Sequence, residues 1–326
     1  MTDDCLVSVL IPVYNVQDFI IRCLDSVVQQ TYKGKMECIL VDDCGTDDSM
    51  VLAEEWIAEK GDRRFRILHH KTNRGLAAAR NTAVEAASGD FVMHLDSDDW
   101  LEFDAIEQLI KKQQETNADI VSGNAVRHDV SNNSILVEPE YATKMEMVWK
   151  MIELNIDHVI WRRLIRRSLY TDNSINAVEG INIGEDHHTL PKLAFYAKKC
   201  VRLDKVVYHY NCINENSYMH SISREAQIKR FHSDLASINI LLAFFDDKDE
   251  KSVKRLKEIK SFFLYRFVTD CYFKKEERNY NDAMKMLYLM GNDCLTLVGL
   301  TGIWQRCIRR TYNRYRLYNF IKTHIK

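Results

Sequence analysis

The sequence predicts an α/β protein built on a mostly parallel sheet that is flanked by helices. First, apolar β-forming runs alternate four times with segments of helical spacing, which is typical of β-α-β units. Second, clusters of polar and acidic residues directly follow three of these runs, where strands of an open sheet present ligand-binding residues. Third, the alternation stops near residue 126, and the pattern is helical from about residue 226. We therefore expect one domain over 1–225 and a helical C-terminal region over 226–326.

Each element follows from a local pattern. The predicted strands cover residues 7–13, 36–41, 65–69, 91–95 and 118–125. The first run is continuously apolar, which indicates a strand buried on both faces. Apolar residues at helical spacing predict helices over residues 19–28, 51–57 and 76–87. Asp104 and Glu107 have the spacing of a capping box for one more helix.

Composition narrows the class of protein. The chain has 326 residues, an apolar fraction of 46% and a formal net charge of −2, so no global field favours nucleic acid as a partner. Nine cysteines without a C-x-x-C pair argue against a zinc site or a disulfide framework. No apolar run reaches the ~18 residues of a membrane-spanning helix, and the acidic N-terminus does not read as a signal peptide. We expect a cytoplasmic protein.

Three carboxylates within four residues form the most informative cluster. Asp96, Asp98 and Asp99 follow the predicted strand 91–95. Like charges so close together repel, and hard oxygen ligands suit Mg²⁺ or Mn²⁺, which commonly bind a substrate's phosphates. The sequence therefore predicts a divalent metal site, and the alternative is an acidic, solvated turn.

Two further clusters follow the first two strands. Pro12, Tyr14 and Asn15 come after the first, and Asp42 and Asp43 end the second. The first loop has neither G-x-G-x-x-G nor G-x-x-x-x-G-K-[ST], so the sequence supports neither a dinucleotide fold nor a P-loop.

A nucleotide would then be held by side chains and by metal. Asp42 or Asp43 can accept a hydrogen bond from a pyrimidine N3–H, and Asp96 can accept from ribose hydroxyls. Helix N-capping is the alternative role for the Asp42–Asp43 pair.

Together these segments resemble the family 2 glycosyltransferases, which are inverting enzymes with a GT-A fold (Rossmann-like) that use nucleotide sugars. The resemblance covers about the first 125 residues. The matching segments are Val9–Asn15, Val41–Asp43, Asn73–Gly75 with Ala79–Asn81, Ser88–Asp90 and Asp96–Asp99. Trp161–Leu164 and Gly184–Asp186 match later motifs of the family more loosely. Cys44-Gly45 departs from the usual Gly-Ser after the paired aspartates.

The resemblance implies roles for particular residues. Asp186 would be the catalytic base, for which a helix N-terminus is the alternative. Asp98 would bind the metal, and Asp96 would share the metal or contact ribose. His209 would be the third metal ligand, unless it is merely packed between its aromatic neighbours. The residues expected to contact the nucleotide sugar are Pro12, Tyr14, Asn15, Asp42, Asp43, Arg74, Arg80, Asp96, Ser97 and Trp161.

Two kinds of contact within this set have alternatives. Arg74 and Arg80 are expected to pair with diphosphate or uracil oxygens, or else to lie on a helix surface. Trp161 is expected to line the sugar or acceptor pocket, or else to belong to the core.

The implied function is transfer of a sugar from a nucleotide-diphosphate sugar, expected to be a UDP-sugar, to a saccharide or lipid-linked saccharide in surface polysaccharide synthesis. Residues 1–125 would form the nucleotide-sugar-binding half and residues 126–225 the acceptor-side half. One alternative is a sugar-nucleotide-binding protein without transfer activity. A nucleotidyltransferase is disfavoured, because the loop after the first strand lacks a glycine-rich basic motif.

The last 24 residues form a basic tail. Residues 303–326 contain five arginines and two lysines with no acid, and their aromatic and aliphatic residues fall near one helical face. This pattern is typical of an amphipathic helix on an anionic membrane surface, here the inner face of the membrane. A terminal helix packed on the protein is the alternative.

Overall fold

A computed structural model describes residues 5–153, 155, 157–214, 223–274 and 276–289. The chain divides into two compact units, Met1–Ser223 and Arg224–Lys326, so that the division falls two residues before the expected boundary. The predicted site residues all lie in the first unit. The basic tail lies outside the described residues.

The first unit combines one twisted sheet with helices. Its strands are Leu6–Val13 (β1), Lys35–Asp42 (β2), Phe65–His69 (β3), Phe91–His94 (β4), Trp100–Leu101 (β5), Ile120–His128 (β6), Ser134–Leu136 (β7), Arg163–Arg166 (β8) and Cys200–Asn211 (β9). Its helices are Ile20–Val28 (α1), Ser49–Lys60 (α2), Leu76–Ala86 (α3), Ala105–Thr116 (α4), Lys144–Ile152 (α5), Ser168–Thr171 (α6) and Glu185–Tyr196 (α7).

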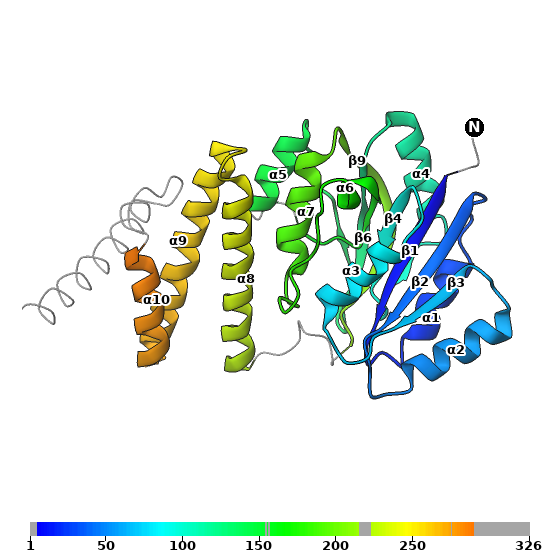
Figure 1. The fold of residues 1–326 in the computed structure, drawn as a ribbon, viewed down its shortest axis with the longest axis horizontal. Coiled ribbons are helices and arrows are strands. Elements are labelled where there is room, and N and C mark those ends of the chain that lie inside the picture. Colours follow the sequence, from blue (N-terminus) through cyan, green and yellow to red (C-terminus); the bar gives the residue numbers. More distant parts are fainter. Residues whose placement is uncertain (1–4, 154, 156, 215–222, 275, 290–326) are drawn as a thin grey trace, which may run out of the picture. The chain divides into compact units, whose positions relative to one another are not determined.

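The strand order is β3–β2–β1–β4–β8–β6–β9–β5, with β7 paired to β6 (Figure 1). The first four strands in this order are parallel. Their carboxyl ends therefore lie at one edge of the sheet, which confirms the fold class and the expected placement of the polar clusters.

The rest of the sheet is mixed. β8 runs antiparallel to both β4 and β6, whereas β9 is parallel to β6 and antiparallel to β5. A short connection, residues 129–133, lets β7 pair antiparallel with β6. The strand–helix alternation that predicts parallel pairing ends after α4, and this is why the second half departs from it.

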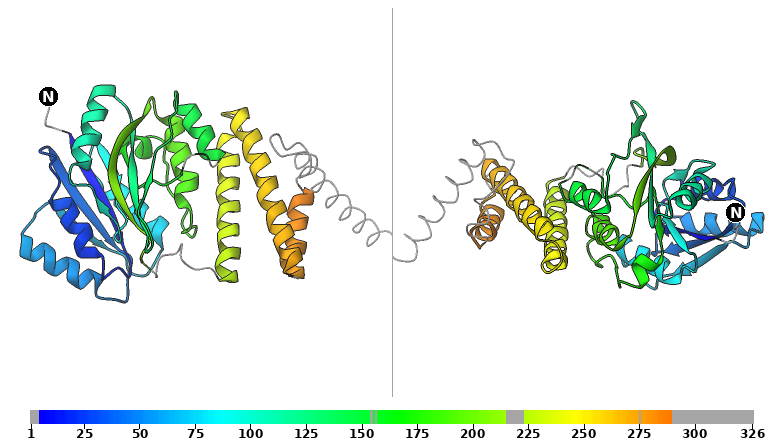
Figure 2. Two further views of the ribbon diagram at one scale, coloured as in Figure 1. Left: turned by 180° about the vertical axis from the view of Figure 1, so that it is seen from behind. Right: turned by 90° about the horizontal axis from the view of Figure 1, so that it is seen from above.

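Helices cover both faces of the parallel half. Figure 1 shows α3 in front of β1 and β2, and the view from behind in Figure 2 shows α1 and α2 on the opposite face. β1 is buried on both faces, as its continuous apolar run predicts. On the α1 side, Val7, Val9 and Ile11 form one core cluster with Leu24 of α1 and Leu109 of α4.

The predicted capping box at the start of α4 is wrong. Asp104 occupies the N-cap position, but its side chain makes no capping hydrogen bond. Its Oδ2 instead accepts a hydrogen bond from Gln108 Nε2 at 2.9 Å, and Glu107 Oε2 accepts one from the hydroxyl of Thr31. The spacing is correct, but a contact to a distant part of the chain replaces the local one.

The described part of the second unit, which ends at Leu289, is helical, as the sequence predicts. It contains Arg224–Phe245 (α8), Glu250–Phe273 (α9) and Glu277–Leu289 (α10). Phe231 of α8 stacks on Phe267 of α9 with ring centroids 3.7 Å apart, inside a small apolar cluster. Arg224 forms ion pairs with Asp270 at 2.6 Å and with Glu276 at 2.7 Å. In the described part of the chain, no helix is both long and apolar enough to cross a membrane.

Candidate active site

The loop after β1 presents one exposed aromatic ring. Pro12 and Val13 are buried, whereas Tyr14 is 40% exposed. Asn15 has a positive φ of 52°, and its Oδ1 accepts a hydrogen bond from the Thr46 backbone at 2.7 Å. Asn15 therefore ties this loop to the loop after β2, and Tyr14 is left at the surface beside the end of β2.

The paired aspartates at the end of β2 have different environments. Asp43 is buried, and its carboxylate accepts hydrogen bonds from the backbone N–H groups of Arg74 at 2.8 Å and Gly75 at 2.7 Å. Its Oδ1 also lies 2.6 Å from His70 Nδ1. Asp42 is more exposed, with Oδ2 3.0 Å from His69 Nδ1 and Oδ1 accepting from the Cys44 backbone. Asp43 thus fastens the loop 73–75, and Asp42 is the member open to a ligand.

The turn after β4 presents two partly exposed carboxylates. Asp96 Oδ1 pairs with Arg80 Nη2 at 2.7 Å, and Asp98 Oδ2 accepts a hydrogen bond from Asn214 Nδ2 at 2.8 Å. Burial raises the pKa of Asp98 to about 6, although the Asn214 hydrogen bond acts in the opposite direction. A bound cation would stabilise the ionised form of this carboxyl group.

The third carboxylate of the turn is structural. Asp99 is buried, and it accepts hydrogen bonds from the Tyr208 hydroxyl at 2.7 Å and from the Asn211 backbone at 2.7 Å. Tyr208 Oη in turn accepts from the Asp96 backbone N–H at 3.1 Å. Ser97 is also buried. Asp99 therefore holds the turn against β9, and β9 fixes where Asp96 and Asp98 lie.

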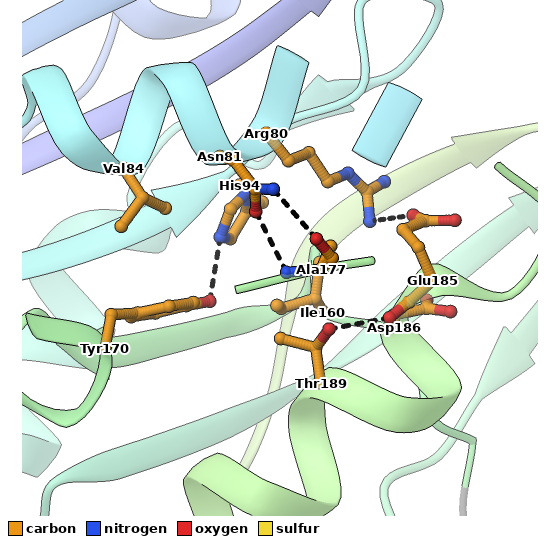
Figure 3. Close-up of a pocket in the computed structure, with 10 residues that line it drawn as sticks. All are labelled: Arg80, Asn81, Val84, His94, Ile160, Tyr170, Ala177, Glu185, Asp186 and Thr189. Carbon is orange, nitrogen blue, oxygen red and sulfur yellow. Dashed lines mark hydrogen bonds and ion pairs between the residues drawn. The ribbon is translucent and has the colours of Figure 1, made fainter. Parts of the chain in front are cut away.

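Arg80 connects this turn to α7. Its guanidinium pairs through Nη1 with Glu185 Oε1 at 2.6 Å (Figure 3). This ion pair is in addition to its contact with Asp96. Burial acts to lower the pKa of Arg80, but the neighbouring carboxylates, Asp96 first, outweigh it and raise the pKa. The arginine is therefore held between two protein carboxylates, and its expected contact with diphosphate or uracil oxygens stays a prediction.

Asp186 lies in the first turn of α7, beside this bridge. It lines a small pocket together with Arg80, Asn81, Val84, His94, Ile160, Tyr170, Ala177, Glu185 and Thr189 (Figure 3). In the described part of the chain, its carboxylate takes part in no hydrogen bond or ion pair. The N-terminus of a helix favours a nearby negative charge, which suits a carboxylate that accepts a proton from a substrate.

The structure places His209 in a different cluster. His209 Nε2 lies 3.0 Å from Glu102 Oε2, and His209 Nδ1 lies 2.9 Å from His128 Nε2. Its ring stacks on Trp100 with centroids 5.0 Å apart. Side chains alternate along a strand, so His209 points away from the face on which Tyr208 reaches the aspartates. This position does not fit the expected role of third metal ligand.

Trp161 and Arg74 also have protein partners. Trp161 is buried in the core cluster and stacks on Tyr208, with ring centroids 4.4 Å apart. It therefore supports the tyrosine beneath the aspartate turn instead of lining a pocket. Arg74 is exposed and pairs with Glu179 at 2.6 Å.

The donor set nonetheless fits a divalent cation that is bound jointly with a substrate. No group of three or more His, Cys, Asp and Glu side chains with metal-binding geometry occurs among the described residues. Mg²⁺ is commonly held by one or two carboxylates together with substrate phosphates and water. Asp98 and Asp96 supply such a pair of oxygen ligands.

Several residues of the site escaped the sequence analysis. The aspartate turn is contacted by three residues that are more than 100 positions away in the sequence, Tyr208, Asn211 and Asn214. No local sequence pattern could therefore predict these contacts. Glu185 belongs to the motif that contains Asp186, but its pairing with Arg80 depends on the fold. No local signal in the sequence indicates this pairing.

A GT-A sheet with aspartates at its carboxyl edge and an Asp at the start of a facing helix defines the class of this protein as a glycosyltransferase. Residues 8–173 match the family model described as Glycosyl transferase family 2, and the chain belongs to this family. This match confirms the resemblance found in the sequence.

Individual relatives agree with the family. The chain is 31% identical to the putative glycosyltransferase EpsH of Bacillus subtilis over 264 residues, which are 79% of this chain and 74% of EpsH. It is 32% identical to the glycosyltransferase GlyA of Streptococcus pneumoniae over 223 residues, which are 64% of this chain but only 31% of GlyA.

A solved structure shares the fold. S. aureus TarS 1–349 in complex with UDP-GlcNAc superimposes with a TM-score of 0.70 at 20% identity, covering 95% of this chain and 91% of that chain. At this identity the likeness concerns the fold.

Proposed function

We propose that this protein is an inverting glycosyltransferase that moves a sugar from a UDP-sugar to a saccharide or lipid-linked saccharide acceptor in surface polysaccharide synthesis. The relation to EpsH and the fold shared with TarS, whose complex contains UDP-GlcNAc, support this proposal. Asp42 and Tyr14 would receive the uracil, and Asp96 the ribose or the metal.

One observation carries the proposal. Arg80 contacts both Asp96 after β4 and Glu185 at the start of α7, which supports placing these carboxylates in one site. Inverting transfer needs a base on the side of the anomeric carbon opposite the leaving diphosphate. Asp186 beside Glu185 is the base in our proposal, and it accepts the proton of the acceptor hydroxyl as that oxygen attacks the sugar.

A divalent metal completes the proposed donor site. Asp98 and Asp96 would hold Mn²⁺ or Mg²⁺, which would offset the negative charge of the diphosphate. Asn214 orients the Asp98 carboxylate through its hydrogen bond to Oδ2.

The test begins with the donor. A panel of UDP- and GDP-sugars is screened by thermal shift with Mn²⁺, with Mg²⁺ and with EDTA, and the best donor is then used for turnover and for NMR of the product's anomeric configuration. We expect stabilisation by one UDP-sugar that depends on metal, together with an inverted product. Donor binding without hydrolysis or transfer to any saccharide or lipid-linked acceptor would indicate the alternative, a binding protein.

Two variants assign the roles. Asp98→Ala should abolish metal-dependent donor binding, and the exposed Asp246→Ala serves as its control. Asp186→Asn keeps the shape of the side chain but cannot accept the proton, so turnover should fall by ~10²-fold or more while donor binding persists. Full activity of Asp98→Ala in EDTA would exclude the metal-dependent mechanism. Full turnover by Asp186→Asn would exclude Asp186 as the base.

A further inference from the structure

Arg80 is a buried side chain whose charge is shared between two motifs. Its side chain is only 6% exposed, and the two ion pairs use different nitrogens, Nη2 to Asp96 at 2.7 Å and Nη1 to Glu185 at 2.6 Å. Glu185 is equally buried, with 5% of its side chain exposed. Asp96 and Glu185 come from the end of β4 and the start of α7, so one planar group fixes the distance between these elements.

The helix that carries Arg80 also holds the segment leading into α7. Asn81 and Ala177 exchange two hydrogen bonds, from Asn81 Nδ2 to the Ala177 carbonyl at 2.8 Å and from the Ala177 N–H to Asn81 Oδ1 at 2.9 Å. Near the start of the same helix, the Ala77 N–H donates to Asn182 Oδ1 at 3.3 Å. These hydrogen bonds attach the segment that precedes α7, and therefore Asp186, to α3.

We propose that Arg80 and Glu185 form a positioning bridge that holds the base Asp186 in register with the donor-side carboxylate Asp96. This inference rests on the function proposed above. It goes beyond that function, because Arg80 and Glu185 act by positioning Asp186 and not by contacting a substrate. Glu185 sits in the first turn of α7, immediately before Asp186. Breaking its ion pair therefore frees the turn that aims the base, while Asp96 keeps its own contact with Arg80.

The bridge predicts a split between turnover and binding. Glu185→Gln has nearly the same shape but no charge, and we expect kcat to fall ~10-fold or more while the Kd for donor changes less than about threefold, since small misplacements of a catalytic group are costly. Arg80→Lys cannot offer two separate nitrogens, so it should lower kcat and also weaken donor binding through Asp96. Burial raises the pKa of Glu185, so kinetics are measured at pH 8 to favour the ionised carboxylate.

The double variant and the controls make the test decisive. If the two residues act as one bridge, Arg80→Lys with Glu185→Gln should lower kcat no further than Arg80→Lys alone. Arg166→Lys changes another Arg–Asp pair of the same unit, with Asp119 at 2.6 Å, and should leave kcat unchanged. Glu185→Asp keeps the charge and should recover part of the turnover lost in Glu185→Gln.

Two results would overturn the bridge. These are wild-type kcat in Glu185→Gln, or losses in the double variant that add independently. Asp186→Asn is measured in parallel, so that an inactive Asp186→Asn beside a fully active Glu185→Gln rejects the bridge and keeps the proposed function. Full activity of Asp186→Asn would instead reject the base on which both proposals depend.

Discussion

Gly75 lies between the buried carboxylate of Asp43 and the side chain of Asn182, which belongs to the segment before α7. Its φ of +86° lies in the left-handed region, and a Cβ there would stand 2.1 Å from Asn182 Nδ2. Its N–H donates to Asp43 Oδ2 at 2.7 Å. Both the backbone conformation and the lack of a side chain therefore matter at this position.

Gly75→Ala should reduce both stability and turnover. The backbone conformation, with φ 86° and ψ 167°, is nearly restricted to glycine and costs an alanine about 1–3 kcal/mol. The contact with Asn182 adds to this cost by displacing the segment before α7. Gly180→Ala is a matched control, because Gly180 has the same φ of +86° but a Cβ added there would meet no heavy atom within 4 Å. Chemical denaturation and kcat are measured for both variants. Equal losses of stability in the two would mean that the contact with Asn182 has no energetic weight.

At the scale of elements, buried charges connect the segment after β7 with the start of β8. Arg162 and Arg163 are fully buried at the start of β8, and both pair with the fully buried Glu138, at 2.8 Å and 3.1 Å. Arg162 also donates to the Leu136 carbonyl at 3.0 Å and pairs with the exposed Asp157 at 3.4 Å. Burial lowers the pKa of Arg162 to about 10, with the neighbouring Arg163 acting in the same direction. One glutamate thus compensates two desolvated arginines.

Glu138→Gln should destabilise the first unit strongly. Removing one partner of a buried ion pair leaves an uncompensated charge, which typically costs about 3–5 kcal/mol. Glu140→Gln breaks the contact of an 88% exposed glutamate with Arg202 and should leave stability unchanged within error. Urea denaturation of the two variants compares them directly. A loss no larger for Glu138→Gln than for Glu140→Gln would contradict this account.

Another element-scale effect concerns α7. His188 is fully buried, and its Nε2 accepts a hydrogen bond from the Val178 N–H at 3.0 Å. Nε2 can accept this hydrogen bond only when it carries no proton, so the imidazole must be neutral. In agreement, burial lowers the pKa of His188 to about 3. Below pH ~6.5 the His188 side chain is protonated in the unfolded chain, whereas it stays neutral in the folded chain.

Stability should therefore fall as the pH decreases from about 6.5 towards 3, with His188 contributing up to roughly 1.4 kcal/mol per pH unit in that window. Glutamine can accept the same hydrogen bond without titrating, so His188→Gln should flatten this part of the curve. Denaturation midpoints at several pH values test the prediction. Parallel curves for the wild type and His188→Gln would show that the histidine is not responsible.

At the scale of the whole molecule, the sequence predicts what depends on local patterns. The parallel strands β1–β4 and their polar ends follow from apolar runs and the residues just beyond them, and the acids of α7 lie where the motif places them. The antiparallel insertion of β8 does not follow, because its pairing with β4 and β6 depends on contacts distant in sequence. The same limit applies to the side chains of the site, because some can be recognised from local sequence and others depend on distant contacts.

Carboxylates at strand ends can be recognised one cluster at a time. Whether a given group faces a ligand or a protein partner is decided by residues far along the chain, as Tyr208 does for Asp99 and Glu185 does for Arg80. Asp42 and Asp43 illustrate the limit. Adjacent and identical in sequence, they differ because the N–H groups of residues 74 and 75 reach only Asp43.

The final prediction concerns residues 303–326, which lie outside the described residues and are argued from sequence alone. Each basic residue near an anionic membrane contributes roughly 1 kcal/mol, so five arginines and two lysines without an acid would together favour binding to such a surface. Binding to the membrane would bring the protein to an acceptor that is linked to a lipid. We expect the full chain to co-sediment with vesicles containing anionic lipid, in a salt-sensitive manner and far less with neutral vesicles, and a chain ending at Gly302 to lose this binding. Equal, negligible sedimentation of both proteins would instead favour a tail that packs on the protein, because its aromatic residues would then be buried and unable to enter the lipid interface.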